Sequence, residues 1–143
     1  MIANNIIQAA IIAHLKANSA LVTWLTNLSA GNEIRETNYQ GALFTYPAVR
    51  AEVGSPLPGP DTSVCYLTTG EVPFTVACFS ESDSSKQADI LAGLVNAALV
   101  GTRINGTGFK SLIIKSDGLT HAARTAERVW RAVVLARMQI YEI

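Results

Sequence analysis

Three polar residues near position 120 are the best candidates for catalytic chemistry in this sequence. Ser116, Asp117 and His121 are the residue types of a triad, in which a hydroxyl attacks, a base takes its proton and a carboxylate orients the base. A triad also needs a rigid element that exposes the nucleophile, and the glycine-flanked turn that usually does so is missing here. No second pairing of a histidine with an acid is available. We therefore predict that the protein is not an enzyme.

A glycine-rich stretch from Gly101 to Gly108 is the next candidate, because glycines let backbone amides approach a phosphate closely. A phosphate-binding loop joins a strand to a helix and carries Lys-Ser or Lys-Thr. Here the glycines follow an expected helix and precede an expected strand. Asn105-Gly106 is typical of a tight turn instead.

The cysteines and histidines are too few for a convincing zinc site. Cys65 and Cys78 predict two free thiols in a reducing compartment, with Cys78 packed on a strand. His14 lies among apolar residues and is expected to pack rather than to bind a ligand. No metal or other cofactor is predicted.

Arginines are concentrated near the carboxyl end of the chain. Four of the seven fall within the last twenty residues: Arg124, Arg128, Arg131 and Arg137. They could form a basic stripe for phosphate, but pairing with carboxylates across subunits, or simple solvation, is the favoured interpretation. The expected partners are Glu33, Glu36 and Glu127.

The stretch from Arg128 to Glu142 predicts one very long strand. Its even positions form an unbroken apolar face: Trp130, Ala132, Val134, Ala136, Met138 and Ile140. Its odd positions are apolar in the middle and basic on either side. A straight strand of this length spans roughly 50 Å, whereas a domain of this size is about 37 Å across. The strand must therefore bend or leave its own domain, and we expect it to join copies of the chain.

Composition also favours assembly. Charged residues make up 15% of the 143 residues, and 11 basic residues cancel 11 acidic ones. Ordinary domains carry about 25% charged residues, so this surface is poorly protected against association. Neutrality argues against a dedicated nucleic-acid binder. The apolar stretch from Ile6 to Ala13 is too short to cross a membrane and has no preceding cation, so we expect synthesis in the cytoplasm without membrane insertion.

Periodicity predicts a single domain over residues 1–143. The expected helices begin at Asn4 or Asn5 and end at Asn18, run from a Ser19 cap to Gly31, and run from a capping box at 84–87 to Gly101. The expected strands cover 33–39, 47–53, 73–80, 109–115 and the terminal stretch. The 73–80 strand is apolar on both faces, which is typical of a central strand covered on both sides. An extended proline-rich loop follows Gly54, and a polar connection covers 116–125. This order predicts an α+β fold, with helices packed on one face of a largely antiparallel sheet.

The layout resembles the tail terminator, or tail-completion, proteins of long-tailed bacteriophages. The likeness is carried by the strand at 47–53, the long loop, the strand ending in FTVACFSES, the helix SSKQADILAGLVNAAL and the terminal strand. It implies a non-enzymatic virion protein of the tail or neck, forming a six-membered ring that caps the tail tube and joins the head connector. It implies as partners other copies of the chain, the tube protein, the connector or stopper protein and, transiently, DNA in the lumen. The residues expected at these contacts are Pro56, Leu57, Pro58, Pro60, Asp61, Arg124, Arg131, Val133, Leu135 and Arg137.

Two other functions fit the same pattern. One is a head-tail connector or neck subunit, which would bind DNA-filled heads rather than tail tubes. The other is a small α+β ligand-binding domain that dimerises through the outer face of the terminal strand and holds an apolar pocket with convergent polar groups.

Overall fold

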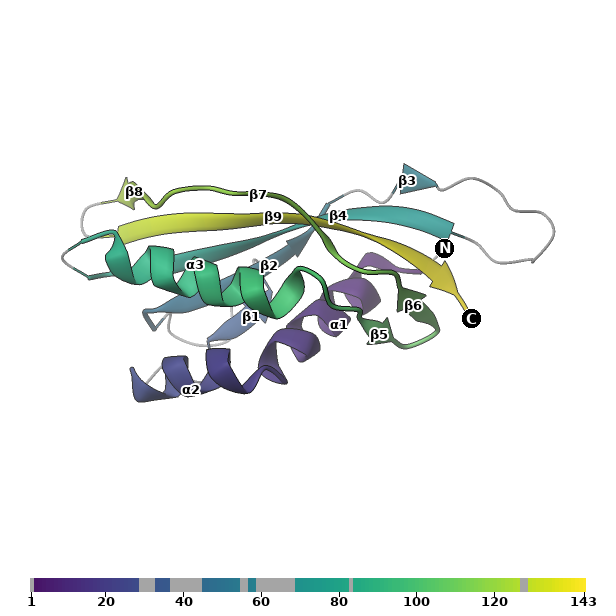
Figure 1. Ribbon diagram of the computed structural model, residues 1–143, viewed down its shortest axis with the longest axis horizontal. Coiled ribbons are helices and arrows are strands. Elements are labelled where there is room, and N and C mark those ends of the chain that lie inside the picture. Colours follow the sequence, from purple (N-terminus) through teal and green to yellow (C-terminus); the bar gives the residue numbers. More distant parts are fainter. Residues whose placement is uncertain are drawn as a thin grey trace.

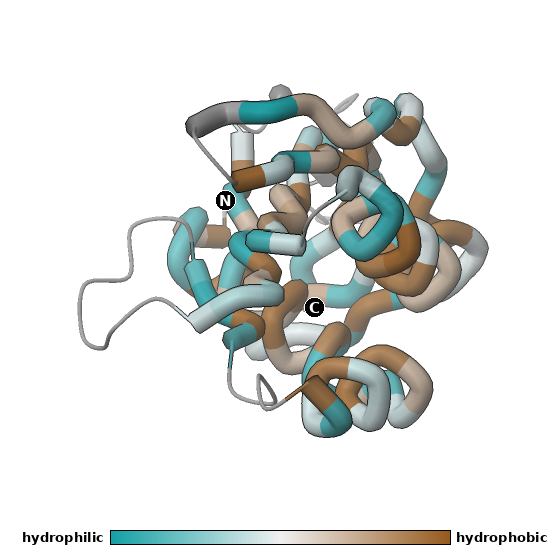
Figure 2. The backbone as a smooth tube through the Cα atoms, turned by 90° about the vertical axis from the view of Figure 1, so that its left-hand side faces the viewer, coloured by the Kyte–Doolittle hydropathy of each residue, from teal (hydrophilic) through white to brown (hydrophobic). Residues whose placement is uncertain are grey.

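The computed structural model describes residues 2–28, 33–36, 45–54, 57–58, 69–82, 84–126 and 129–143. Three helices lie on one side of a single twisted sheet, whose two longest strands run along the long axis of the molecule (Figure 1). Seen end-on, the helices and the sheet enclose an interior rich in hydrophobic residues (Figure 2).

Strand pairing places all nine strands of the described residues in one sheet, in the order β1-β2-β4-β9-β6-β5. The remaining strands lie beside the long ones, with β3 paired to β4 and both β7 and β8 paired to β9. Only β1 and β2 are parallel among these pairs. The strands are β1 (Ile34–Glu36), β2 (Ala48–Val53), β3 (Leu57–Pro58), β4 (Thr69–Ser80), β5 (Asn105–Gly106), β6 (Phe109–Ser111), β7 (Lys115–Leu119), β8 (Ala123–Ala126) and β9 (Val129–Glu142). The predicted fold class is confirmed: α+β, with a largely antiparallel sheet and a long terminal strand.

The terminal strand β9 bends within its own sheet. One edge pairs with β4 from Trp130 to Tyr141. The other edge pairs with β8, β7 and β6 in turn, and the amides of Leu112 and Thr120 donate to β9 carbonyls between them. Both edges of β9 therefore find backbone hydrogen-bond partners within one copy of the chain. Its length gives no support for assembly, contrary to the expectation from sequence, because bending resolves the conflict between strand length and domain size.

Alternation along β9 is as predicted. Its even positions from Ala132 to Ile140 are at most 3% exposed, and the odd positions are half-buried or exposed. On β4, Phe74 and Cys78 are buried on the same side, but Thr75 and Phe79 are only half-buried. The expectation that β4 is covered on both sides was wrong, because the helices pack on one face of the sheet.

Sequence reasoning misplaced the strands between α3 and β9. The predicted strand at 109–115 ends at Ser111, and the predicted polar connection at 116–125 contains most of β7 and β8. Neither strand has an apolar periodicity of its own. Their conformation is set by the free edge of β9, which supplies hydrogen-bond partners to whatever chain lies beside it.

The first two helices, α1 (Asn4–Lys16) and α2 (Ser19–Asn27), form the predicted helical pair, but their caps differ from prediction. Ala3 occupies the N-cap of α1 without a side-chain hydrogen bond, so neither Asn4 nor Asn5 caps it. Asn18 caps α2 by accepting a hydrogen bond from the amide of Leu21 at 3.0 Å, in the place expected for Ser19. One asparagine thus separates the two helices. The expected end at Gly31 lies outside the described residues.

The third helix, α3 (Lys86–Leu99), is not started by the expected capping box. Ser85 has helical backbone angles and makes no capping bond. The Gln87 side chain accepts a hydrogen bond from the hydroxyl of Ser80 at the end of β4, so it ties the helix to the sheet. The buried side of α3 comprises Ala88, Leu91, Ala92, Val95, Ala98 and Leu99, whereas Ile90 is 41% exposed.

The ends of α1 and α3 meet at His14. Its Nε2 lies 3.0 Å from the Ala98 carbonyl oxygen and 3.0 Å from Thr102 Oγ1. This is the packing role expected from the sequence.

No single helix in the described ranges is long and apolar enough to cross a membrane. Together α1 and α2 have the necessary length and composition, but the two helices are bent by 73° relative to each other.

Candidate functional site

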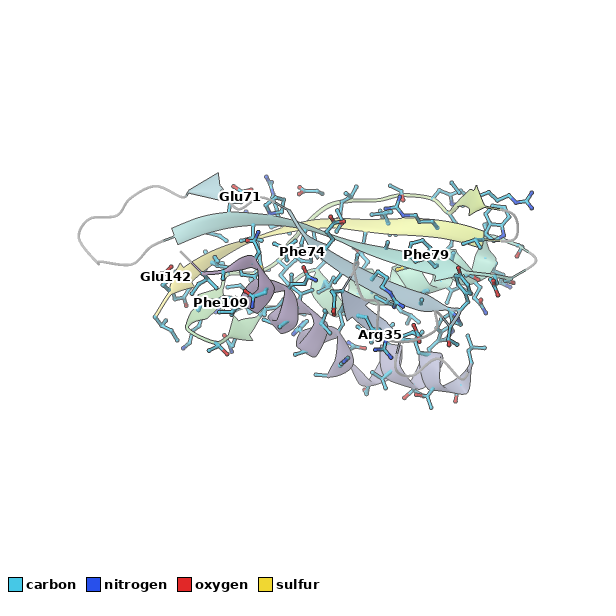
Figure 3. The ribbon with its side chains drawn as sticks, turned by 180° about the vertical axis from the view of Figure 1, so that it is seen from behind. Arg35, Glu71, Phe74, Phe79, Phe109 and Glu142 are labelled. Carbon is cyan, nitrogen blue, oxygen red and sulfur yellow. The ribbon has the colours of Figure 1, made fainter. Side chains whose placement is uncertain are left out.

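The face of the sheet opposite the helices carries four of the residues predicted to contact partners: Arg131, Val133, Leu135 and Arg137. Because residues paired across antiparallel strands point the same way, Thr75 and Ala77 of β4 share this face with Leu135 and Val133 of β9. We call these four residues, with Arg131 and Arg137, the outer face. The arginines are exposed and the four central residues are buried or half-buried. Figure 3 shows Glu71 on this side of β4 and Phe74 toward the helices.

A hollow of about 330 Å³ crosses the outer face and is here called the sheet groove. Pro73 and Leu135 are among its apolar lining residues, and Glu52 and Asp117 also line it. At Gly54 the β2 chain comes close to β4, with the Gly54 amide donating to the Pro73 carbonyl at 2.8 Å. A Cβ at this glycine would lie 3.0 Å from that carbonyl oxygen, so the close approach favours glycine.

Arg137 joins three strands across the outer face. Its Nε lies 3.3 Å from Asp117 Oδ1, and its Nη1 lies 3.4 Å from Glu71 Oε1. All three side chains are 41 to 48% exposed, so solvent screens both pairs strongly. The partners are within the chain and are not among those predicted, since strand register brings residues together that are 20 and 66 positions apart.

Glu33, one of the carboxylates expected to reach across subunits, is instead buried at the β1–β2 edge. Its Oε2 lies 2.8 Å from Arg50 Nη2, and its carbonyl accepts a hydrogen bond from Arg50 Nη1 at 2.7 Å. The two residues are 5% and 4% exposed. This ion pair is therefore internal to the protein and cannot serve an interface without leaving its site.

Arg124 lies apart from the other predicted contact arginines. It pairs with Trp130 across β8 and β9, and its Cζ lies 5.8 Å from the centre of the indole ring. Trp130 belongs to the even positions of β9, so Arg124 is on the helix side of the sheet. Arg128 and Glu127 lie outside the described residues.

The proline-rich loop is described only at β3, where the backbones of Leu57 and Pro58 pair with Glu71 and Gly70 of β4. The other predicted loop contacts, Pro56, Pro60 and Asp61, lie outside the described residues. The proline-rich loop is thus joined to the sheet at β3, next to the outer face.

The structure does not assemble the possible triad. Ser116 Oγ accepts a hydrogen bond from the Gly118 amide at 3.2 Å, and Asp117 pairs with Arg137. His121 is 84% exposed, and its Nδ1 lies 3.3 Å from Asp89 Oδ2 on α3. Each of these three residues therefore has a different neighbour, and their arrangement offers no nucleophile held by a base.

The glycine-rich stretch forms a hairpin. Asn105 and Gly106 pair with Lys110 and Phe109, and Gly108 adopts a left-handed φ of 79° in the turn. The predicted turn is therefore displaced by two residues: Asn105 and Gly106 are paired strand residues, and Thr107 and Gly108 form the turn. Among the residues that the structure describes, no cluster of three or more His, Cys, Asp or Glu side chains could hold a metal.

Burial raises the pKa of two groups. Desolvation raises the pKa of the buried Cys78 thiol far above its ordinary value. The pKa of Tyr46 is raised mainly by burial and also by the Glu81 carboxylate, with Arg50 acting in the opposite direction. Both shifts keep the groups protonated at neutral pH, so neither is prepared to act as a nucleophile or base.

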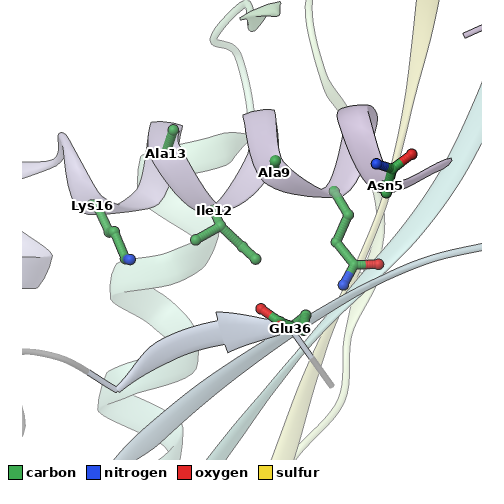
Figure 4. Close-up of a pocket in the computed structure, with 7 residues that line it drawn as sticks. Asn5, Ala9, Ile12, Ala13, Lys16 and Glu36 are labelled. Carbon is green, nitrogen blue, oxygen red and sulfur yellow. The ribbon is translucent and has the colours of Figure 1, made fainter. Parts of the chain in front are cut away.

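A larger hollow of about 570 Å³ lies between α1 and β1 (Figure 4). Ala9 and Ala13 line it from the helix, and Lys16 and Glu36 add opposite charges. Glu36, which was expected from the sequence to pair with an arginine of another subunit, lines this hollow from β1 instead. Its polar lining consists of Asn5, Gln8 and Lys16 from α1 and Glu36 from β1.

Sequence reasoning missed the lining of the sheet groove, notably Glu52 and Gly54. Alternation along β2 places Glu52 on the same side as the outer face, so this residue could have been predicted from the sequence. It also missed several exposed apolar side chains at the periphery of the fold: Ile90, Leu112, Ile113 and Leu119.

Comparison with known proteins gave one kind of match. No family model and no curated protein matches this sequence. Among solved structures, a chain from the virion of a native gene transfer agent particle has the same fold, with a TM-score of 0.71. The two sequences are 17% identical, and the match covers 96% of each chain. Over almost all of its length, this chain therefore has the fold of a chain known from a virion.

Proposed function

We propose that this protein is a structural virion protein of the tail terminator type. In this role six copies form a closed ring that caps the tail tube and joins it to the head connector. The observation that carries the proposal is the fold shared with a chain of the gene transfer agent virion over 96% of both chains. The order of strands and helices in the sequence independently resembles the tail terminator family. A ring subunit also accounts for a low-charge surface and for an outer face with apolar residues that no described helix covers.

The proposed contacts are the outer face and the proline-rich loop that follows Gly54. Val133 and Leu135 supply apolar area, and Arg131 and Arg137 surround it with charge. Arg124 faces the helix side and would therefore contact a different neighbour from the outer-face arginines. The tube protein, the connector and DNA in the lumen are the other proposed partners. The role requires no cofactor and no catalytic group.

Mass measurement and electron microscopy of the purified protein test this role. We expect closed rings, either alone at high concentration or on added tail tubes. A strict monomer under both conditions would contradict the proposal. Binding to DNA-filled heads but not to tubes would favour the connector alternative, and a dimer without rings would favour the ligand-binding alternative.

A further inference from the structure

The solvent side of α3 has an unusual composition for an exposed helix. Lys86, Ile90, Gly93 and Ala97 follow helical spacing and are all exposed, with Ile90 at 41%. We call these four residues the α3 face. Exposed helix faces normally carry mostly polar and charged residues, whereas Lys86 is the single charge in this set. The protomer therefore leaves an apolar helix face open.

Gly93 is not explained by the packing of the protomer. It lies in the middle of α3, where glycine is less favourable than alanine by about 1 kcal/mol. Among the described residues, no atom other than its chain neighbours and its own helix backbone lies within 4 Å of the position that a Cβ would take. Room for alanine is available, but the sequence has glycine. Glycine at this position would let a neighbouring molecule approach the helix backbone closely.

The sheet groove has the complementary properties. Pro73 and Leu135 are among its apolar lining residues, and Glu52 supplies a carboxylate on the β2 side. The other carboxylate, Asp117, already pairs with Arg137 within the protomer. The α3 face is apolar and carries the cation Lys86. A 14-residue helix is about 21 Å long, and the 12 paired residues of β4 and β9 extend over roughly 40 Å, so the sheet is long enough to receive it.

From these features we propose that α3 of one copy docks in the sheet groove of the next copy. This inference rests on the proposed ring function and identifies the surfaces that would build the ring. The α3 face and the groove lie on opposite sides of the protomer, because α3 packs on the other face of the same sheet (Figure 1). A contact between two different surfaces is head-to-tail, and repeated copies of it generate a closed ring when the rotation between them closes. In this arrangement Gly93 would permit the close approach, and Lys86 would face Glu52 of the next copy.

A mixing experiment tests the pairing of these surfaces. Ile90→Asp blocks the α3 face and Leu135→Asp blocks the groove, so each variant alone should be monomeric. An equimolar mixture should form dimers and nothing larger, because one intact α3 face and one intact groove remain between the two variants. Sedimentation measures the masses, and circular dichroism checks the folding of each variant. Thr75→Lys is a second groove variant in case Leu135→Asp fails to fold.

Leu119→Asp is the matched control, since Leu119 is 47% exposed and belongs to neither surface. It should assemble as the unmodified protein does. If the Ile90 and groove variants form rings of normal mass, the docking is wrong although the ring function stands. If both variants are monomeric and their mixture also stays monomeric, the two surfaces do not meet each other. An unmodified chain that never assembles contradicts both the docking and the ring.

Charge exchange and glycine replacement give two further readouts. Lys86→Glu and Glu52→Lys should each weaken association about tenfold, and the double variant should recover most of that loss. Gly93→Ala should raise the stability of the isolated protomer yet weaken association about tenfold. Additive losses in the double charge variant, or unchanged association of Gly93→Ala, would overturn the close contact at these positions.

Discussion

The two faces of β4 and β9 differ although the same two strands build both. On the helix side, Val76 and Val134 are fully buried, whereas Thr75 and Leu135, their neighbours in sequence, are only half-buried on the outer face. The strands themselves do not create this difference, since both faces carry apolar residues. It arises because α1 and α3 pack on one side only. A partly exposed apolar sheet face that no helix of the described residues covers points to a partner, which is the physical basis of the proposed assembly.

The largest expected effect comes from the covered face. Phe74→Ala should lower the free energy of unfolding by about 3–5 kcal/mol, because Phe74 is 1% exposed and its loss leaves a cavity. Urea unfolding at pH 7 measures the change. Leu135→Ala, on the outer face, is the matched control and should cost well under half as much. Equal losses would mean that both faces are packed alike in the isolated protein, and the comparison would fail.

Breaking the buried ion pair between Glu33 and Arg50 should lower stability almost as much. Glu33→Ala leaves the charged, 4% exposed Arg50 without its carboxylate, so we expect a loss of about 3–5 kcal/mol in the free energy of unfolding. Replacing both partners, as Glu33→Leu with Arg50→Met, should recover most of that loss in the same urea measurement. A double variant that is no more stable than Glu33→Ala would show that Arg50 has another indispensable role.

The buried thiol on the helix side makes stability depend on pH. Because burial raises the pKa of Cys78, the unfolded chain loses this proton near pH 8.5 while the folded protein keeps it. The unfolded state then binds fewer protons, so stability falls as pH rises above about 8.5, by at most about 1.4 kcal/mol per pH unit. Urea titrations between pH 8 and 9.5 measure the slope. Cys78→Ala should remove this contribution and Cys65→Ser should leave it intact; a slope that survives Cys78→Ala would assign it to another group.

The smallest expected effect is at the exposed ion pairs of the outer face. Arg137→Ala should change the free energy of unfolding by less than about 1 kcal/mol, because solvent and salt screen its pairs with Glu71 and Asp117. Repeating the urea measurement at 1 M NaCl should reduce the difference further. A loss close to that of Glu33→Ala would show that solvent exposure does not determine how much these ion pairs contribute to stability.

Sequence patterns predicted the long elements well and the short ones poorly. The strands at 73–80 and 129–142 and the helix at 86–99 have apolar residues at a sustained period, which restricts both their conformation and their buried side. The cap of α2 was misplaced by one residue because Asn18 and Ser19 offer similar capping groups, and only the path of the chain selects between them. β7 and β8 were missed because a short polar strand takes its conformation from its neighbour.

The predicted site was partly assembled by the fold. Arg131, Val133, Leu135 and Arg137 share a face, as alternation along one strand requires. Arg124 was separated from them because its strand pairs with β9 in a register that places it beside Trp130. The groove carboxylates come from β2 and β7, two strands that no local pattern connects.

The amino-acid sequence by itself determined which residues of each long strand share a face, because alternation is a property of neighbouring residues. The tertiary structure alone decided which face the helices cover, which carboxylate meets which arginine, and where β9 bends. Those outcomes depend on pairing between segments that lie as far apart as Thr69 and Tyr141, 72 positions, where register rather than residue type selects the partner.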